Sequence, residues 1–367
     1  MRVISRFVVS CSQICYHLCQ KNLGGMDKRT FMSECAKYAR LFQSHSRGYA
    51  VRELQSQLYA FVHHRIIIIS DTLKMSETPC EPTVLTVVKD DLDRMKLFFQ
   101  HYRMLGVRQF VIIDNGSTDG TLEWVSQQQD TRCYRVSTKF QTESKVGWIE
   151  KVLSLTGYNR WYVVVDSDEL LDYVGSERNN LMSLLLIAQN NGYKHLNGYL
   201  LDMYSDKPLF TEDCKYSDIV SRFRYFDVSS YFLRDIHSPI IDTEINSQRG
   251  GPRARLFKNK DISLNKQSVF YFDTDTLYCN PHYLWPYQGC KENPQCFVLR
   301  HYKFLKRDLC EFERRVEAKC FWNGSIEYRG YIDAYHDNLG ICMKCNESKE
   351  YISSHSLSTL PFLESLF

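Results

Sequence analysis

The sequence has no long hydrophobic run and little net charge. Its most compact apolar cluster, RIIIIS at residues 65–70, is far shorter than the ~20 residues that a membrane-spanning helix needs. The chain contains 46 Lys and Arg against 43 Asp and Glu, which gives a formal net charge of +3. A nucleic-acid-binding protein usually carries a dense basic face or stripe. We therefore expect no nucleic acid among the partners.

The cysteines also lack a repeating spacing. There are 14 of them, scattered along a chain of 367 residues, and this pattern argues against a disulfide framework. Cys342 and Cys345 have a spacing that suits two zinc ligands, but no second pair with matching spacing follows, so free thiols are the simpler interpretation. The N-terminal stretch 1–21 makes a poor signal peptide, because polar residues interrupt its apolar part. These features predict a soluble, cytoplasmic protein.

Two changes of pattern suggest how the chain is organised. Apolar residues recur at helical spacing in 30–43 and 51–64, so residues 1–78 are predicted to be a helical extension of unknown role. A polar, proline-containing stretch at 74–83 then marks a boundary. We predict a main domain at 79–335 and a C-terminal tail at 336–367.

The main domain begins with alternating strand and helix patterns. TVLTVV (83–88) predicts a strand, residues 91–106 a helix that ends at Gly106, and RQFVIID (108–114) a second strand. The alternation continues to about residue 192. Closely connected strand, helix, strand units form parallel sheets. The predicted fold is therefore α/β, with a Rossmann-type, mostly parallel sheet flanked by helices.

Acidic residues follow one of the apolar runs. WYVVVDSDELLDY (161–173) predicts a buried strand that ends in a cluster of carboxylates. In an extended segment Asp166 and Asp168 would share a face. Two hard oxygen ligands suit Mg²⁺ or Mn²⁺, and such ions often complete their shell with substrate phosphates. The alternative is that these acids cap the next helix.

A polar loop follows the preceding strand, VIIDNGSTDGT at 111–121. This loop is predicted at the same edge of the sheet as the acidic cluster, and ligands of open α/β sheets bind at that edge. Asp114 and Asn115 offer acceptors and donors that suit a base and a ribose. An ordinary connection between a strand and a helix explains the same residues equally well.

Together these motifs resemble the nucleotide-sugar domain of glycosyltransferase family 2 and its GT-A-fold relatives. The resemblance is to a bacterial subgroup whose first strand is followed by a Lys-Asn-Glu-like signature, which here reads Lys89, Asp90, Asp91. Further along, the chain resembles the later motifs of this subgroup in the same order, with QRGGPRARLF (248–257), LRHYKFLK (299–306) and WNGSIEYRGY (322–331). The resemblance covers residues 83 to about 335.

The resemblance implies a metal-dependent glycosyltransferase in bacterial surface polysaccharide synthesis. Such an enzyme moves a sugar from a nucleoside diphosphate donor to a glycan or carrier-linked acceptor, with Mn²⁺ or Mg²⁺ held by Asp166 and Asp168. For the donor it implies contacts from Asp91, Asp114, Asn115, Lys145 and Asp166. A solvated lysine on a helix surface is the alternative for Lys145.

The later motifs add three candidate residues. If RARLF is extended, Arg253 and Arg255 face one way and suit a phosphate or an acidic sugar of the acceptor, although solvated arginines at a surface turn are the alternative. His301 is a candidate third metal ligand, with a hydrogen-bonded histidine of the fold as the alternative. An acceptor on a lipid-linked carrier would bring the enzyme into peripheral contact with a membrane.

An inverting transferase also needs a general base. We consider nine of the acids between the metal motif and GGPR as candidates: Asp202, Asp206, Glu212, Asp213, Asp218, Asp227, Asp235, Asp242 and Glu244. Asp235 lies at the distance along the chain that the family resemblance implies, and we prefer it. Two other functions stay open, a nucleotidyltransferase and a non-catalytic protein that binds nucleotide sugars or glycans.

Overall fold

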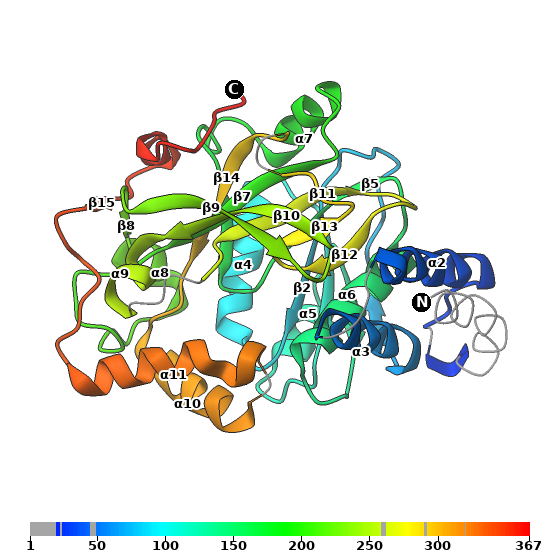
Figure 1. The fold of residues 1–367 in the computed structure, drawn as a ribbon, viewed down its shortest axis with the longest axis horizontal. Coiled ribbons are helices and arrows are strands. Elements are labelled where there is room, and N and C mark those ends of the chain that lie inside the picture. The colour runs from blue at the N-terminus through cyan, green and yellow to red at the C-terminus, as the bar shows by residue number, and fades with distance from the viewer. Residues whose placement is uncertain (1–19, 23, 45–48, 258–261, 290–291, 320) are drawn as a thin grey trace.

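A computed structural model describes residues 20–22, 24–44, 49–257, 262–289, 292–319 and 321–367 (Figure 1). Its helices are α2 (Lys28–Ser44), α3 (Tyr49–His63), α4 (Leu92–Met104), α5 (Thr121–Ser126), α6 (Thr142–Thr156), α7 (Leu181–Asn190), α8 (Tyr216–Arg222), α9 (Gly251–Phe257), α10 (Lys306–Ala318) and α11 (Trp322–Asp337). Its strands are β1 (Ile67–Asp71), β2 (Thr83–Val88), β3 (Gln109–Asp114), β4 (Thr131–Arg135), β5 (Arg160–Val164), β6 (Glu169–Asp172), β7 (His195–Asp202), β8 (Tyr225–Asp227), β9 (Tyr231–Ser238), β10 (Thr243–Gly250), β11 (Asn265–Phe272), β12 (Leu277–Asn280), β13 (Tyr283–Trp285), β14 (Gln295–His301) and β15 (Ser348–Glu350).

A 9-stranded sheet forms the centre of the fold, in the order β1-β4-β3-β2-β5-β11-β7-β14-β6. Strands β2, β3, β4 and β5 are parallel to one another, and β7 and β14 run in the same direction. Strands β1, β11 and β6 run the opposite way. The prediction of an α/β fold with a mostly parallel sheet is confirmed.

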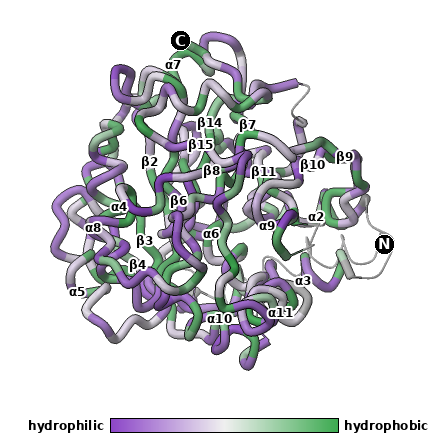
Figure 2. The backbone as a smooth tube through the Cα atoms, turned by 90° about the vertical axis from the view of Figure 1, so that its left-hand side faces the viewer, coloured by the Kyte–Doolittle hydropathy of each residue, from purple (hydrophilic) through white to green (hydrophobic). Residues whose placement is uncertain are grey.

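The strands alternate between two hydrophobic cores because successive side chains point to opposite faces. In β3, Phe110 and Ile112 join the core beneath α4 and α7, whereas Val111 and Ile113 join the core beneath α6. Both faces of these parallel strands are therefore buried, as their continuous apolar sequences indicate. Figure 2 shows the result, with hydrophobic chain through the sheet and hydrophilic chain in the outer loops.

The predicted elements between residues 83 and 192 are all present. The helix that begins at Leu181 is capped, because the Asn180 side chain accepts a hydrogen bond of 3.0 Å from the Ser183 backbone N–H. Gly106 follows α4 with a φ of 89°, a conformation that glycine adopts without strain. Local sequence patterns therefore determine this half of the sheet.

The N-terminal segment packs onto the main domain. Residues 1–19 of the predicted extension lie outside the described residues, but α2 and α3 are helical as expected, and β1 then pairs with β4 at the sheet edge. At the contact between α3 and α6, a Cβ atom on Gly147 would lie 2.4 Å from the backbone oxygen of Gln57. Strand β1, which precedes the predicted boundary near residue 78, therefore adds an edge strand to the central sheet.

The C-terminal segment is also integrated. Strand β15 pairs with β8, and Leu357 and Leu360 are buried in the core beneath α4 and α7. Among the described residues, no helix combines the length and the apolar character needed to cross a membrane.

Candidate active site

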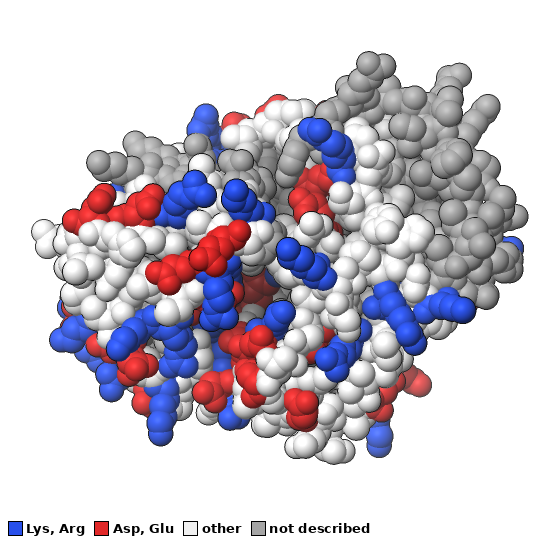
Figure 3. Space-filling view, turned by 90° about the horizontal axis from the view of Figure 1, so that it is seen from below, with Lys and Arg blue, Asp and Glu red and all other residues white. Residues whose placement is uncertain are grey.

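Polar side chains gather at one edge of the central sheet. Strands β2, β5, β7 and β14 end at this edge, and the antiparallel strands β6 and β11 begin there. Helices α10 and α11, which follow β14, lie below the edge in Figure 1. The face seen from below has a hollow with acidic and basic side chains mixed around it (Figure 3). Ligands of open α/β sheets bind at the carboxyl ends of the parallel strands, and this edge is formed by those ends.

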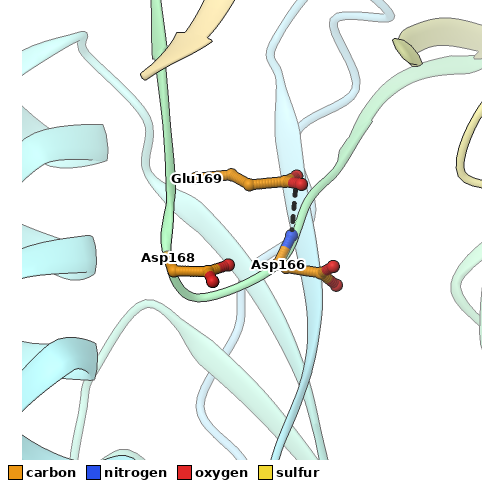
Figure 4. A group of neighbouring side chains, drawn as sticks. All are labelled: Asp166, Asp168 and Glu169. Atoms are coloured by element: carbon orange, nitrogen blue, oxygen red, sulfur yellow. Dashed lines mark hydrogen bonds between the residues drawn. The ribbon is translucent and has the colours of Figure 1, made fainter. Parts of the chain in front are cut away.

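The acidic motif lies in a turn between β5 and β6. Strand β5 ends at Val164, so the prediction that Asp166 and Asp168 share the face of an extended strand is wrong. The turn instead brings one carboxylate oxygen each from Asp166, Asp168 and Glu169 within 4.8 Å of one another (Figure 4). The Asp166 backbone N–H donates a 3.1 Å hydrogen bond to Glu169 Oε2, which fixes the turn.

Strand register places His301 beside this turn. His301 is the last residue of β14 and pairs with Glu169, so its imidazole reaches Asp168, with 3.4 Å between Nε2 and Oδ2. On the other side β14 pairs with β7, and His301 Nδ1 lies 2.9 Å from Asp202 Oδ1. Although burial lowers the pKa of His301, the two carboxylates outweigh it and raise this pKa above its ordinary value.

A buried arginine extends the network. The Arg253 guanidinium is 2% exposed and contacts Asp202 Oδ2 at 2.7 Å and Glu327 Oε1 at 3.1 Å. Lys303, two residues after His301, reaches the same Glu327 oxygen at 3.2 Å. The contacts therefore run without a gap from Asp168 to helix α11.

Two lysines face the acidic turn. Lys145 of α6 forms an ion pair with Asp166, and Lys266 of β11 lies 2.7 Å from Glu169 Oε1. Burial raises the pKa of Asp166, but Lys145 and Lys266 outweigh it and hold the pKa below its usual range. Burial also raises the pKa of Asp168, but nearby cations, chiefly His301, outweigh it and lower this pKa below its usual range. Both carboxylates are therefore ionised near neutral pH.

The end of β2 also meets the turn. The Ser167 hydroxyl donates a hydrogen bond to the Asp91 carboxylate, and Arg94 lies 3.4 Å from the same carboxylate. Burial raises the pKa of Asp91, while Arg94 opposes this shift. The structure thus brings Asp91, Lys145, Asp166, Asp168 and His301 together, as the sequence predicted.

Asp114 and Asn115 hold their own loop. The Asp114 carboxylate is buried and accepts hydrogen bonds from the backbone N–H groups of Gly116, at 2.9 Å, and Ser117, at 3.1 Å. The Asn115 side chain donates to the backbone oxygens of Val136 and Thr138. These contacts explain the loop without a ligand, and a contact with a nucleoside stays a prediction.

The arginines of GGPRARLF are arranged differently from the prediction. The segment forms helix α9, not an extended strand, and residues two apart on a helix do not face the same way. Arg253 faces Asp202, whereas Arg255 pairs with Asp227, with 3.1 Å between Nη2 and Oδ2. Gly250, the last residue of β10, has a φ of 107°, and a Cβ there would lie 2.0 Å from the Ser230 backbone oxygen, so this close approach requires glycine.

The preferred general base lies on the hairpin of β9 and β10. Asp235 is exposed on β9, and its hydrogen-bond partner is the Asn246 side chain of β10. Of the nine acids considered, the structure brings Asp202 to the network around His301 instead. The role of Asp235 stays a prediction.

Sequence reasoning missed several residues of this site, namely Arg94, Lys266, Lys303 and Glu327, and it named Asp202 only as one of nine candidate bases. Most lie far from the acidic motif in the chain, and only strand register and helix packing bring them together. Glu169 could have been found, since it directly follows Asp168. Among the described residues, one group of three side chains lies close enough together to hold a metal ion, and it is Asp166, Asp168 and Glu169 of the acidic turn. Within the described part of the chain, Cys342 and Cys345 do not belong to such a group.

The acidic turn fits a hard divalent cation. Two oxygen ligands of one Mg²⁺, each at roughly 2.1 Å, lie about 3 Å apart at neighbouring octahedral corners. Asp166 and Asp168 keep 37% and 22% of their side chains exposed. Glu169 is 2% exposed, and both its oxygens already have partners. Of the three acids, Asp166 and Asp168 are therefore the ones that could hold a cation, with His301 Nε2 next to Asp168 and Glu169 as a support.

No protein-family model matches this chain, and a search of curated proteins finds no match.

Proposed function

We propose that the chain is a GT-A-type glycosyltransferase that moves a sugar from a nucleoside diphosphate sugar to a glycan or carrier-linked acceptor. The observation that carries the proposal is the turn at the end of β5, where Asp166, Asp168 and Glu169 present carboxylate oxygens within 4.8 Å of one another. The turn lies at the sheet edge where the parallel strands of the central sheet end, as expected for a nucleotide site in this class of fold.

Asp166, Asp168 and His301 would hold Mn²⁺ or Mg²⁺ in this enzyme. Such an ion neutralises the charge that grows on the diphosphate when the glycosidic bond breaks. Asp202 accepts from His301 Nδ1 and so directs Nε2 toward Asp168, an arrangement that often orients metal-binding histidines. Arg253 in turn keeps Asp202 in place and compensates its buried charge.

Other residues of the chain would position the donor. Lys145 has a cationic Nζ beside Asp166 and would approach the phosphates. Asp91 and the loop that follows Asp114 lie at the ends of the neighbouring strands β2 and β3, on the side expected for the nucleoside. The loops are tied together, because the Asp90 backbone N–H donates a 2.9 Å hydrogen bond to Ser117.

Ligand-induced stabilisation tests the proposal directly. Thermal denaturation is measured with a panel of nucleotide sugars, with Mn²⁺ and with EDTA. A true donor binds the folded state and should raise the midpoint only with the metal, by an amount that grows with its concentration. Release of the nucleoside diphosphate then measures turnover, which separates an enzyme from a protein that only binds.

Matched variants locate the metal site. Asp168→Asn removes a ligand and should abolish both the metal-dependent shift and turnover. Asp206→Asn removes an exposed acid that pairs with Lys344 and should change neither. Full turnover of the Asp168→Asn protein, or equal turnover in EDTA, would refute the proposed site.

A further inference from the structure

A second cleft lies at the opposite end of the central sheet, with a volume of about 420 Å³. It is lined by His195, the first residue of β7, and Tyr271, near the end of β11. The acidic turn instead faces the other ends of these strands, at Asp202 and Lys266. The 8 residues of β7 rise by roughly 3.3 Å each, so the two places are on the order of 23 Å apart. The cleft is therefore separate from the proposed active site.

Aromatic and apolar side chains form part of its wall. Trp285 and Tyr271 line the cleft and are both partly exposed, and Leu284 and Pro286 lie beside them. The Arg40 guanidinium of α2 lies 5.6 Å from the centroid of the Trp285 ring and extends this wall. Clefts of about 300–1,000 Å³ with aromatic walls and a few polar groups are typical of small-molecule sites.

The polar groups of the cleft are balanced in charge. Lys194 Nζ lies 2.7 Å from Asp273 Oδ2, and Arg40 Nη1 lies 3.2 Å from Asp275 Oδ1. Burial lowers the pKa of His195, which keeps its imidazole neutral near pH 7. The lining thus offers both donors and acceptors, without an excess of either charge.

We propose that this cleft binds a neutral oligosaccharide. The C–H face of a sugar ring packs on an aromatic side chain. Each sugar hydroxyl both donates and accepts hydrogen bonds, so it can bind the aspartates and the basic side chains of the two ion pairs. An anionic ligand would have to displace an aspartate from its cation. An apolar ligand would bury the same polar groups without partners, which is unfavourable. The proposal does not depend on glycosyl transfer at the acidic turn.

Saturation-transfer NMR on the full chain tests this site. The probes are short oligosaccharides of glucose, galactose, mannose and N-acetylglucosamine, with an oligomer of galacturonic acid as the charged comparison. At least one neutral probe should bind. Trp285→Ala should weaken that binding by about threefold to tenfold, as expected from the loss of an aromatic contact. Tyr59→Ala, at an aromatic residue of α3 that is 59% exposed, is the matched control and should not change it.

Asp275→Asn provides a second variant that should not disturb folding, because its side chain is 71% exposed. It should weaken the neutral probe as well, and circular dichroism checks that each variant is folded. Asp168→Asn should bind the probe normally, which keeps this site distinct from the proposed active site. Failure of every neutral probe, binding of the acidic oligomer alone, or unchanged affinity in both cleft variants would overturn the proposal.

Discussion

Replacing Lys37 by methionine should destabilise the junction between α2 and the main domain. The Lys37 ammonium lies 2.7 Å from Glu34 Oε1 and 3.0 Å from Glu150 Oε1, and it donates to the Thr276 backbone oxygen at 2.7 Å. All three charged side chains are 0% exposed. Methionine fills a similar volume but leaves two buried carboxylates without a cation. Loss of one partner of a buried ion pair costs about 3–5 kcal/mol.

An exposed pair with the same helical spacing provides the control. Lys96 lies 3.2 Å from Asp93, also three residues away, but these side chains are 49% and 65% exposed. Lys96→Met should therefore cost no more than about 1 kcal/mol. Urea unfolding is followed by fluorescence and by circular dichroism, and coincident curves justify a two-state free energy. Equal losses in the two variants would refute the reasoning.

The same cluster predicts how stability depends on pH. Burial raises the pKa of Glu150 well above its ordinary value of 4.5, despite the opposing effect of Lys37. A raised pKa in the folded state means that the contribution of Glu150 is complete below about pH 4.5 and is lost as the pH rises toward the folded pKa. Glu150→Gln should flatten this part of the stability profile. An unchanged slope in that variant would assign the dependence to other groups.

Two further changes test other parts of the fold. Gly147→Ala should lower the free energy of unfolding by about 1–3 kcal/mol, because the new Cβ would lie 2.4 Å from the Gln57 backbone oxygen. Gly330→Ala, on a helix with open space around it, is the control and should cost nothing in the same urea titration. Asp114→Ala should weaken the binding of a nucleoside diphosphate, since it releases the loop at the end of β3. An unchanged dissociation constant by calorimetry would contradict that role.

Sequence patterns predicted the parallel half of the sheet because its signals are local. Strand β3, for example, is a continuous apolar run between Gly106 and a glycine-containing loop, and helix α7 has both an N-cap and a terminal glycine. The same locality explains why Asp166 and Asp168 could be recognised, although not their conformation. A strand that is one or two residues longer would include an acid that otherwise lies in the following turn. The sequence does not specify the residue at which β5 ends.

The rest of the site depends on contacts between distant segments. Asp202 approaches His301 because β7 pairs with β14 in one register, and Lys266 approaches Glu169 because β11 runs antiparallel to its neighbours. Neither register follows from the composition of a strand. A shared face for Arg253 and Arg255 required RARLF to be extended, but the segment is helix α9, in which the two arginines pair with different acids.

The ion pair between Lys145 and Asp166 predicts an exchange of partners when substrate binds. In the structure Lys145 forms an ion pair with Asp166, which we propose as a metal ligand. The ammonium and the metal ion therefore compete for the Asp166 carboxylate. A diphosphate resolves this competition, because its oxygens offer the lysine another anion. Lys145→Met should therefore tighten the binding of free Mn²⁺ but weaken the binding of a nucleoside diphosphate in the presence of Mn²⁺. Both constants are measured by calorimetry, with Lys139→Met as the control at a nearby exposed lysine. If both affinities fall together, Lys145 only supports the fold around Asp166, and if neither changes, it has no part in the site.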